Sequence, residues 1–160
     1  MVRKSRPLMT YPMRDSIGHL VNLTHRKLQP MLERRVKAYG LSYGTWFFLR
    51  ALWEKDGGTQ RELAARVGAS EPTTLYAVRE LARRGLVMLR TDRHDRRRLD
   101  IGLTKKARDL YRVLIPSVAE INGVLLNGLR RREVSELRRM LRIIKDNTAR
   151  DNFKSSKNGD

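Results

Sequence analysis

The chain has 160 residues, 40% of them hydrophobic, and this length suits one or two small cores. It contains 35 lysines and arginines against 17 aspartates and glutamates, so the formal net charge is +18 and a polyanionic partner such as nucleic acid is expected. The sequence has no cysteine, which excludes disulfides, thiolate zinc sites and thiol-based redox switches.

The N-terminal segment before Asp15 is charged and contains two prolines but no long apolar run. It matches neither a signal peptide nor a membrane anchor, and we expect a cytoplasmic protein. From about Asp15 to Tyr39, apolar residues recur at helical spacing and predict a first helix. Pro30 should bend or restart this helix, and Gly40 is placed to end it.

The next segment predicts a second helix that begins at residues 42–45 and ends at the DGG tripeptide of residues 56–58. Its large apolar residues Trp46, Leu49 and Trp53 are spaced to share one face. We expect this face in the core.

Two shorter helices follow. Thr59 and Glu62 have the spacing of a capping box at the start of a third helix, which Gly68 would close. Ser70 predicts the start of a fourth helix, which runs through Arg84.

After Gly85, the segments LVMLRT and RLDIGL alternate well enough to predict two strands joined by the polar turn DRHDRR. The stretch from Thr59 to Thr104 therefore reads as two short helices, a strand, an arginine-rich turn and a second strand. This order is typical of a winged helix-turn-helix, which presents one helix to the major groove of DNA and a basic hairpin to the neighbouring backbone or minor groove.

Beyond Thr104, a long apolar stripe interrupted by Pro116 predicts another helix, and a final helix precedes a polar tail. The long amphipathic helices at both ends must bury their apolar faces, and packing against a second copy is an economical solution. The sequence therefore predicts a two-fold homodimer formed by the N- and C-terminal helices.

The predicted fold class is mainly α with a small β wing, a winged helix-turn-helix with long terminal dimerisation helices. We predict four segments along the chain. They are an N-terminal tail and dimerisation helix (1–42), the DNA-binding domain (43–103), the C-terminal dimerisation helices (104–151) and a flexible tail (152–160).

The fourth predicted helix would read DNA, because the second helix of a helix-turn-helix lies in the major groove with its N-terminal residues toward the bases. Leu75, Val78, Leu81 and Ala82 recur at three- and four-residue spacing and are expected to be buried. Threonine and arginine can hydrogen-bond bases, although first-turn threonines also suit helix starts in any protein. The candidate DNA contacts on this helix are Ser70, Glu71, Thr73, Thr74, Tyr76 and Arg79.

The predicted turn between the strands is crowded with arginine. Arginine enters narrow minor grooves and forks onto phosphates, and clustered like charges repel unless an anion relieves them. A solvated turn is the alternative. We interpret Asp92 and Asp95 as partners that orient the arginines, and not as metal ligands. The candidate wing contacts are Arg93, Arg96, Arg97 and Arg98.

These motifs resemble the MarR family, the multiple-antibiotic-resistance type of transcriptional regulators. Asp95-Arg96-Arg97, followed at the expected spacing by Leu103-Thr104, resembles the family's D-R-R wing and the L-T that opens its long helix. The segment TQRELAARVGASEPTTLYAVRELARRGLV is similar to the family's T-x-x-E-L-A … L-E-x-x-G-L-V core. The resemblance covers about residues 14–150.

The resemblance implies a homodimer that binds a pseudo-palindromic operator, usually represses nearby genes, and is often released by a small aromatic or phenolic ligand. It also implies that Arg97 enters the minor groove. Two positions depart from the family pattern. Ser70 stands where some members have an aspartate that braces this arginine, and Glu71 is unusual in facing DNA. Glu71 would either select a cytosine amino group or cap the helix.

The resemblance further implies an effector pocket between the first two helices, the long fifth helix and the DNA-binding lobe. Aromatic side chains, with an arginine for a carboxylate, suit such a ligand. Packing of these aromatics in the core or the dimer interface is the alternative. The candidate pocket residues are Arg14, His19, Tyr39, Tyr43, Trp46, Phe47 and Arg50.

An enzyme is not expected, because the sequence has no nucleophile elbow, phosphate-binding loop or metal-binding cluster, and no cofactor is predicted. His19, His25 and His94 lack the spacing of metal ligands. The principal rival is a nucleic-acid binder that is indifferent to sequence and driven by net charge.

Overall fold

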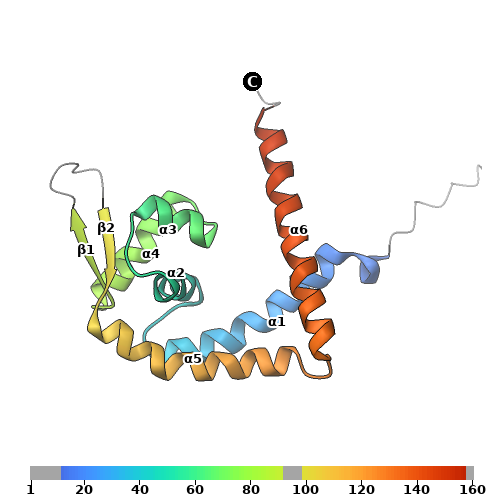
Figure 1. The fold of residues 1–160 in the computed structure, drawn as a ribbon, viewed down its shortest axis with the longest axis horizontal. Helices are drawn as coiled ribbons and strands as arrows, with labels where there is room; N and C mark the ends of the chain where they lie inside the picture. The colour runs from blue at the N-terminus through green and yellow to red at the C-terminus, as the bar shows by residue number, and fades with distance from the viewer. Residues whose placement is uncertain (1–11, 92–98, 158–160) are drawn as a thin grey trace, which may run out of the picture. The chain divides into compact units, whose positions relative to one another are not determined.

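The computed structural model describes residues 12–91 and 99–157, and the side chains of residues 12–90 and 99–148. The fold is mainly α with a small β wing, as predicted (Figure 1). The elements in chain order are a short 3-10 helix η1 (Met13–Asp15), α1 (Ile17–Lys37), α2 (Tyr43–Glu54), α3 (Gln60–Val67), α4 (Glu71–Arg83), β1 (Val87–Thr91), β2 (Leu99–Leu103), α5 (Lys105–Leu125) and α6 (Arg131–Lys157).

The chain divides into two compact units, Met1–Ile121 and Asn122–Asp160, and the division falls within α5. The first unit contains the helix-turn-helix and the strands. The four segments predicted from the sequence were defined by expected function, whereas this division reflects compactness. The predicted boundaries remain predictions.

The predicted helix caps of the first unit are present. Thr59 accepts a hydrogen bond from the backbone N–H of Glu62 at 3.2 Å, and the Glu62 carboxylate accepts one from the N–H of Thr59 at 2.8 Å. This reciprocal pair is the predicted capping box of α3. Ser70 caps α4, and Thr104 accepts from the N–H of Ala107 in the first turn of α5 at 3.2 Å.

Both prolines lie inside continuous helices, Pro30 in α1 and Pro116 in α5. The sequence predicted a bend or restart of the first helix at Pro30 and an interruption of the fifth at Pro116. The structure shows no break in helical structure at either proline. A proline inside a helix costs about 3 kcal/mol. Each helix continues because it buries apolar side chains beyond its proline, including Leu32 and Val36 in α1 and Ile121 in α5.

The core of the first unit surrounds α2, which packs against α1, α3 and α4 and contacts β2. Trp46 and Leu49 are buried, as predicted, and Trp53 is partly buried with its indole N–H donating to the carbonyl of Ala107 at 2.9 Å. A buried tryptophan N–H needs such a partner. This bond ties α2 to the start of α5.

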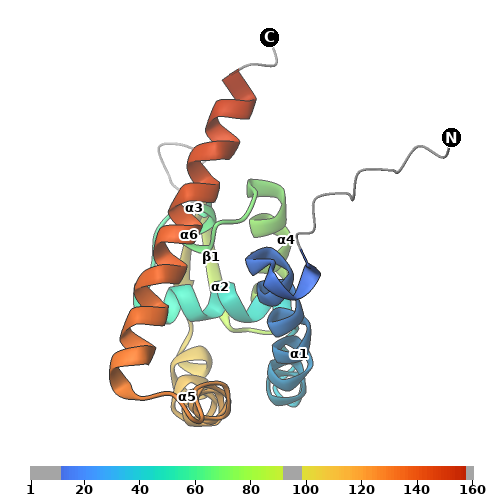
Figure 2. The ribbon, with the colours of Figure 1, turned by 90° about the vertical axis from the view of Figure 1, so that its right-hand side faces the viewer.

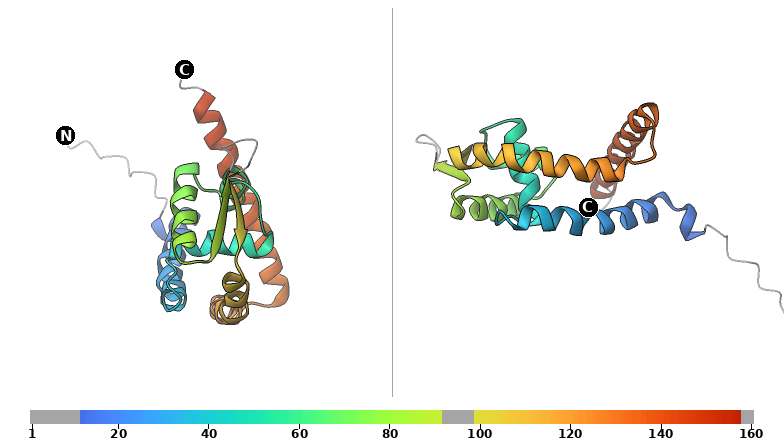
Figure 3. Two further views of the ribbon diagram at one scale, coloured as in Figure 1. Left: turned by 90° about the vertical axis from the view of Figure 1, so that its left-hand side faces the viewer. Right: turned by 90° about the horizontal axis from the view of Figure 1, so that it is seen from below.

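The wing is an antiparallel pair in which Val87 lies opposite Leu103, and β1 lies against α4 (Figure 3). The residues before α3 extend this sheet. Thr59 forms a bridge with Asp100, and the N–H of Ile101 donates to the carbonyl of Gly58 at 2.9 Å. Sequence reasoning missed this edge because residues 56–58 read as a turn.

The second unit contains the end of α5 and the long helix α6, which is continuous over its whole length (Figure 2). It extends to Lys157, whereas the sequence pattern predicted a flexible tail from residue 152. Among the described residues, no helix is both long and apolar enough to cross a lipid bilayer.

Candidate nucleic-acid interface

Helices α3 and α4 form a helix-turn-helix, joined at Gly68, which ends α3 with φ of +73°. The side-chain amide of Gln60, the first residue of α3, donates to the carbonyl of Glu71, the first residue of α4, at 3.0 Å. This bond fixes the start of one helix against the start of the other. Val78 and Leu81 of α4 are buried, as predicted, and the predicted core residues Leu75 and Ala82 are half-buried.

The outer face of α4 is polar and open to solvent. Glu71, Thr73, Tyr76 and Arg79 are exposed, and Tyr76 is 69% exposed although it is a large aromatic residue. The side chains of Glu71, Tyr76 and Arg79 form no hydrogen bond or ion pair with any residue that the structure describes. Their polar groups are therefore free to contact another molecule. Ser70, at the start of this face, is exposed and serves as the N-cap.

The prediction that Thr74 lies on this face was wrong. Its side chain is fully buried, and its hydroxyl donates to the carbonyl of Ser70 at 2.9 Å. The N–H of Thr74 donates to the same carbonyl at 2.9 Å. Packing around the start of α4 encloses Thr74, so only Thr73 of this pair faces outward.

The predicted wing contacts Arg93, Arg96, Arg97 and Arg98 lie outside the described residues, as do Asp92 and Asp95. The strands that carry this turn are described. On β1, Met88 and Arg90 point to the outer face of the sheet, opposite the core residues Val87 and Leu89.

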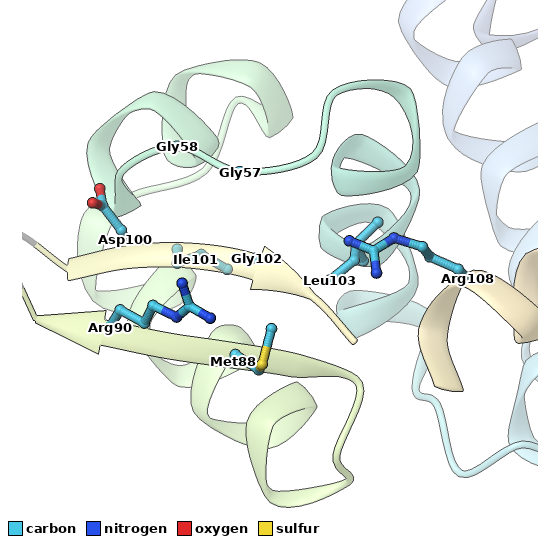
Figure 4. Close-up of a pocket in the computed structure, with 9 residues that line it drawn as sticks. All are labelled: Gly57, Gly58, Met88, Arg90, Asp100, Ile101, Gly102, Leu103 and Arg108. Carbon is cyan, nitrogen blue, oxygen red and sulfur yellow. The ribbon is translucent and has the colours of Figure 1, made fainter. Parts of the chain in front are cut away.

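A shallow hollow of about 510 Å³ lies on this outer face of the wing (Figure 4). Arg90 reaches toward it from β1 and Arg108 from α5, while Gly57, Gly58 and Gly102 leave backbone exposed. Arg90 forms no ion pair with a described residue. Sequence reasoning missed Arg90 as a candidate phosphate contact, although the alternation of the strand LVMLRT places its side chain outward.

A buttress at the base of the wing consists of Asp56, Leu103 and Arg108. The Asp56 carboxylate accepts hydrogen bonds from the N–H of Leu103 at 2.8 Å and from the Arg108 guanidinium at 2.7 Å. Partial burial alone would raise the pKa of Asp56, but these two bonds and the Arg108 charge outweigh it and lower the pKa below its usual value. The ionised carboxylate thus joins the loop after α2 to β2 and α5.

The predicted effector residues lie in several separate places. Arg14 is exposed beside Asp15, His19 is half-buried in the first turn of α1, and Arg50 pairs with Glu54 at 3.2 Å. Trp46 is only 3% exposed and belongs to the core, where its ring meets that of Trp53 at 5.6 Å. For Trp46 the alternative of core packing is therefore correct.

Tyr39 lies at the end of α1 beside a different hollow, which Leu86, Lys106 and Val113 also line.

Tyr43 and Phe47 lie together at the start of α2, with ring centroids 5.0 Å apart. His25 of α1, which sequence reasoning did not select for a pocket, joins them: its Nε2 lies 3.0 Å from the hydroxyl of Tyr43. Partial burial raises the pKa of Tyr43. This aromatic cluster combines apolar rings with a polar pair. Among the described residues, no group of three or more histidine or acidic side chains could hold a metal ion.

Comparisons with known proteins agree with this geometry. A model of the MarR family matches residues 39–98. A MarR transcriptional regulator from Methanosarcina mazei is 26% identical; the match covers 84% of this chain and 96% of that one, with a TM-score of 0.76. CouR from Rhodococcus jostii, bound to p-coumaroyl-CoA, is also 26% identical, with 84% and 95% covered and a TM-score of 0.74.

A structure from Listeria monocytogenes in complex with 26mer DNA has the same fold; it is 23% identical, covers 91% of this chain and 96% of its own, and has a TM-score of 0.80. The family model spans the helix-turn-helix, and the structural matches extend over most of the chain. Residues 39–98 therefore match the MarR family, and over most of its length the chain is similar to winged helix-turn-helix transcriptional regulators of that family.

Proposed function

We propose that the protein is a sequence-specific repressor that binds a pseudo-palindromic operator as a homodimer. The observation that carries this proposal is the outer face of α4, where Glu71, Tyr76 and Arg79 are exposed and unpaired among the described residues. Charged and aromatic groups left free on the second helix of a helix-turn-helix are placed to contact base edges. The family relative in complex with 26mer DNA supports the same use of this fold.

The wing contributes affinity in this proposal. Arg97, with Arg93, Arg96 and Arg98, would contact the minor groove and its phosphates, and Arg90 would add a phosphate contact at the base of the hairpin. Ser70, Thr73 and Glu71 would contact the operator from the start of α4. The buried Thr74 has no direct role.

Operator specificity is tested by selecting bound sequences from a random duplex library. The selected and the random duplexes are then titrated at several salt concentrations. A specific regulator should prefer its selected site by about a thousandfold or more at physiological salt. Equal affinity for both duplexes would overturn the proposal in favour of a binder that is indifferent to sequence.

We further propose that a small aromatic or phenolic ligand releases the protein from DNA by binding at the cluster of His25, Tyr43 and Phe47. The cluster offers ring faces and a hydroxyl–imidazole pair, and CouR, a relative of similar fold, binds p-coumaroyl-CoA. Of the other predicted pocket residues, Arg14 and His19 precede His25 in the N-terminal part of the chain.

The ligand proposal is tested by adding p-coumaroyl-CoA and simple hydroxybenzoates to the complex with the selected operator. Release by one of them, lost in Tyr43→Ala, is expected. A ligand can shift the equilibrium only if it prefers one state. Release that is unchanged in Tyr43→Ala would place the effector elsewhere.

A further inference from the structure

The positive charge of this protein is not concentrated in its DNA-reading module. Thr59 to Thr104 contains ten arginines and six acidic residues, a net charge of +4 out of +18. Residues 130–145 contain seven basic and two acidic residues, a net charge of +5 in a third of the length. The start of α6 is therefore more densely cationic than the helix-turn-helix and wing.

Three of these cations form one row along α6. Arg131, Arg138 and Arg142 are seven and four residues apart, so at 3.6 residues per turn they fall within an arc of about 40°. All three are exposed. At a rise of 1.5 Å per residue the row is about 16 Å long, which corresponds to several phosphates at 3.4 Å per nucleotide along one DNA strand. We call these residues the α6 arginine row.

The acidic side chains that the structure describes on this helix do not neutralise the row. Glu133 accepts a hydrogen bond from the N–H of Arg130 at 2.7 Å and so caps the helix. Glu136 pairs with Arg139, and Asp146 pairs with Lys145. None of the three arginines of the row forms an ion pair with a residue that the structure describes.

The row also borders a shallow depression. Arg131 and Arg138 line a hollow of about 330 Å³ with Ser135, and the apolar residues Leu126, Leu129 and Val134 form the rest of its lining. Guanidinium groups beside an apolar surface suit a polymer in which anionic phosphates alternate with apolar sugar faces.

We propose that the α6 arginine row is a second phosphate-binding surface, which contacts duplex DNA outside the operator. This inference rests on the proposed DNA-binding function, because that function brings duplex DNA, a polyanion, to the protein. The row adds affinity without sequence preference, and it strengthens the salt dependence of binding.

The test uses the full-length triple variant Arg131→Gln, Arg138→Gln, Arg142→Gln. The matched control is Lys27→Gln, Lys37→Gln, Arg34→Gln, which removes the same charge from exposed positions of α1. Affinity is measured against salt for an operator duplex of about 20 base pairs and for the same operator in about 60 base pairs.

On the long duplex, the slope of log affinity against log salt should fall by about 2.7 for each copy of the row in contact. The loss of affinity between 50 and 200 mM salt should then shrink by roughly 40-fold. The short duplex should change much less, and the α1 control should retain most of the wild-type slope.

Equal slopes for the row variant and the wild type on the long duplex would overturn the inference, and so would an equal fall in the α1 control. If the row variant sediments as a monomer and its slope is unchanged, the row contacts a second copy of the chain and not DNA. That result would also overturn the inference. If wild-type protein does not prefer the operator, the proposed function fails. The slope on random duplex then still decides whether the row binds DNA.

Discussion

Neighbouring threonines at the start of α4 have different environments, and this difference gives a test of the reading face. Thr74→Val should leave operator affinity nearly unchanged, because the Thr74 side chain is enclosed and bonded to Ser70. It should cost about 0.5–1.5 kcal/mol in the free energy of unfolding, the usual value of one hydrogen bond. Arg79→Ala should cost about 1–3 kcal/mol in operator binding with little loss of stability. Gel-shift titration and urea unfolding of both variants check these values; a Thr74→Val protein that folds but binds as weakly as Arg79→Ala would refute the assignment.

Arg66 of α3 caps the end of another helix. Its guanidinium donates to the carbonyls of Ala51, Lys55 and Gly57 at 3.1, 2.6 and 3.0 Å. Bonds from a charged donor to carbonyls at and just beyond a helix end are stabilising. Arg66→Ala should lower the free energy of unfolding by about 1–3 kcal/mol, and Arg66→Lys should not restore it, because an ammonium lacks the planar fork. Arg61→Ala, a change at an exposed arginine of the same helix, is the control, and chemical unfolding is the measurement. Full recovery by lysine would show that charge alone matters.

At the scale of elements, the sequence predicted those features that depend on neighbouring residues. The capping box of Thr59 and Glu62, the left-handed Gly68 and the two strands follow from local patterns, and all are present. What the sequence missed depends on contacts between distant segments. Thr74 is buried because α4 packs against α2 and α3, and the sheet edge at Gly58 exists only through its pairing with β2. For Trp46, helical spacing predicted a core face shared with Leu49 and Trp53, whereas the family resemblance made it a pocket candidate; its burial agrees with the spacing.

The buttress of Asp56 should make the wing's anchorage sensitive to acid. The pKa of Asp56 is lower in the folded protein than in the unfolded chain, so the ionised carboxylate stabilises the fold above its unfolded pKa, near 4. That contribution is lost as the pH falls through the lower, folded pKa. Asp56→Asn keeps an acceptor for the Leu103 N–H but loses the ion pair with Arg108. Wild type should therefore melt at a higher temperature than Asp56→Asn at pH 7, and the difference should shrink below pH 4. Calorimetric melts across this range check it; a difference that does not vary with pH would exclude the ion pair.

At the scale of the whole molecule, several apolar side chains among the described residues are exposed in the single chain, and two groups of them lie on helices far apart in the sequence. One lies on the first turns of α1, where Ile17, Leu20 and Val21 are exposed. The other lies on α6 and includes Met140, Leu141, Ile143 and Ile144. Exposed apolar surface of this extent on a monomer indicates an interaction site, and we predict that a second copy of the chain covers it. The proposed operator contact also requires two reading helices about 34–36 Å apart, which only a dimer supplies.

Deletion of residues 130–160 tests this assembly. Among the described residues, the buried hydrophobic core lies at or before Ile121, so the truncated chain should remain folded, with cooperative unfolding and a helical circular dichroism spectrum. It should sediment as a monomer, because the apolar face of α6 is gone. Its affinity for an isolated half-site should be nearly that of the full-length chain, apart from any phosphate contacts made by α6. Its affinity for the complete operator should fall by two orders of magnitude or more, because the second reading helix is no longer held at a high effective concentration near its half-site. A truncated protein that is folded and still sediments as a dimer would show that α6 is not required for pairing, and would leave α1 as the surface to test next.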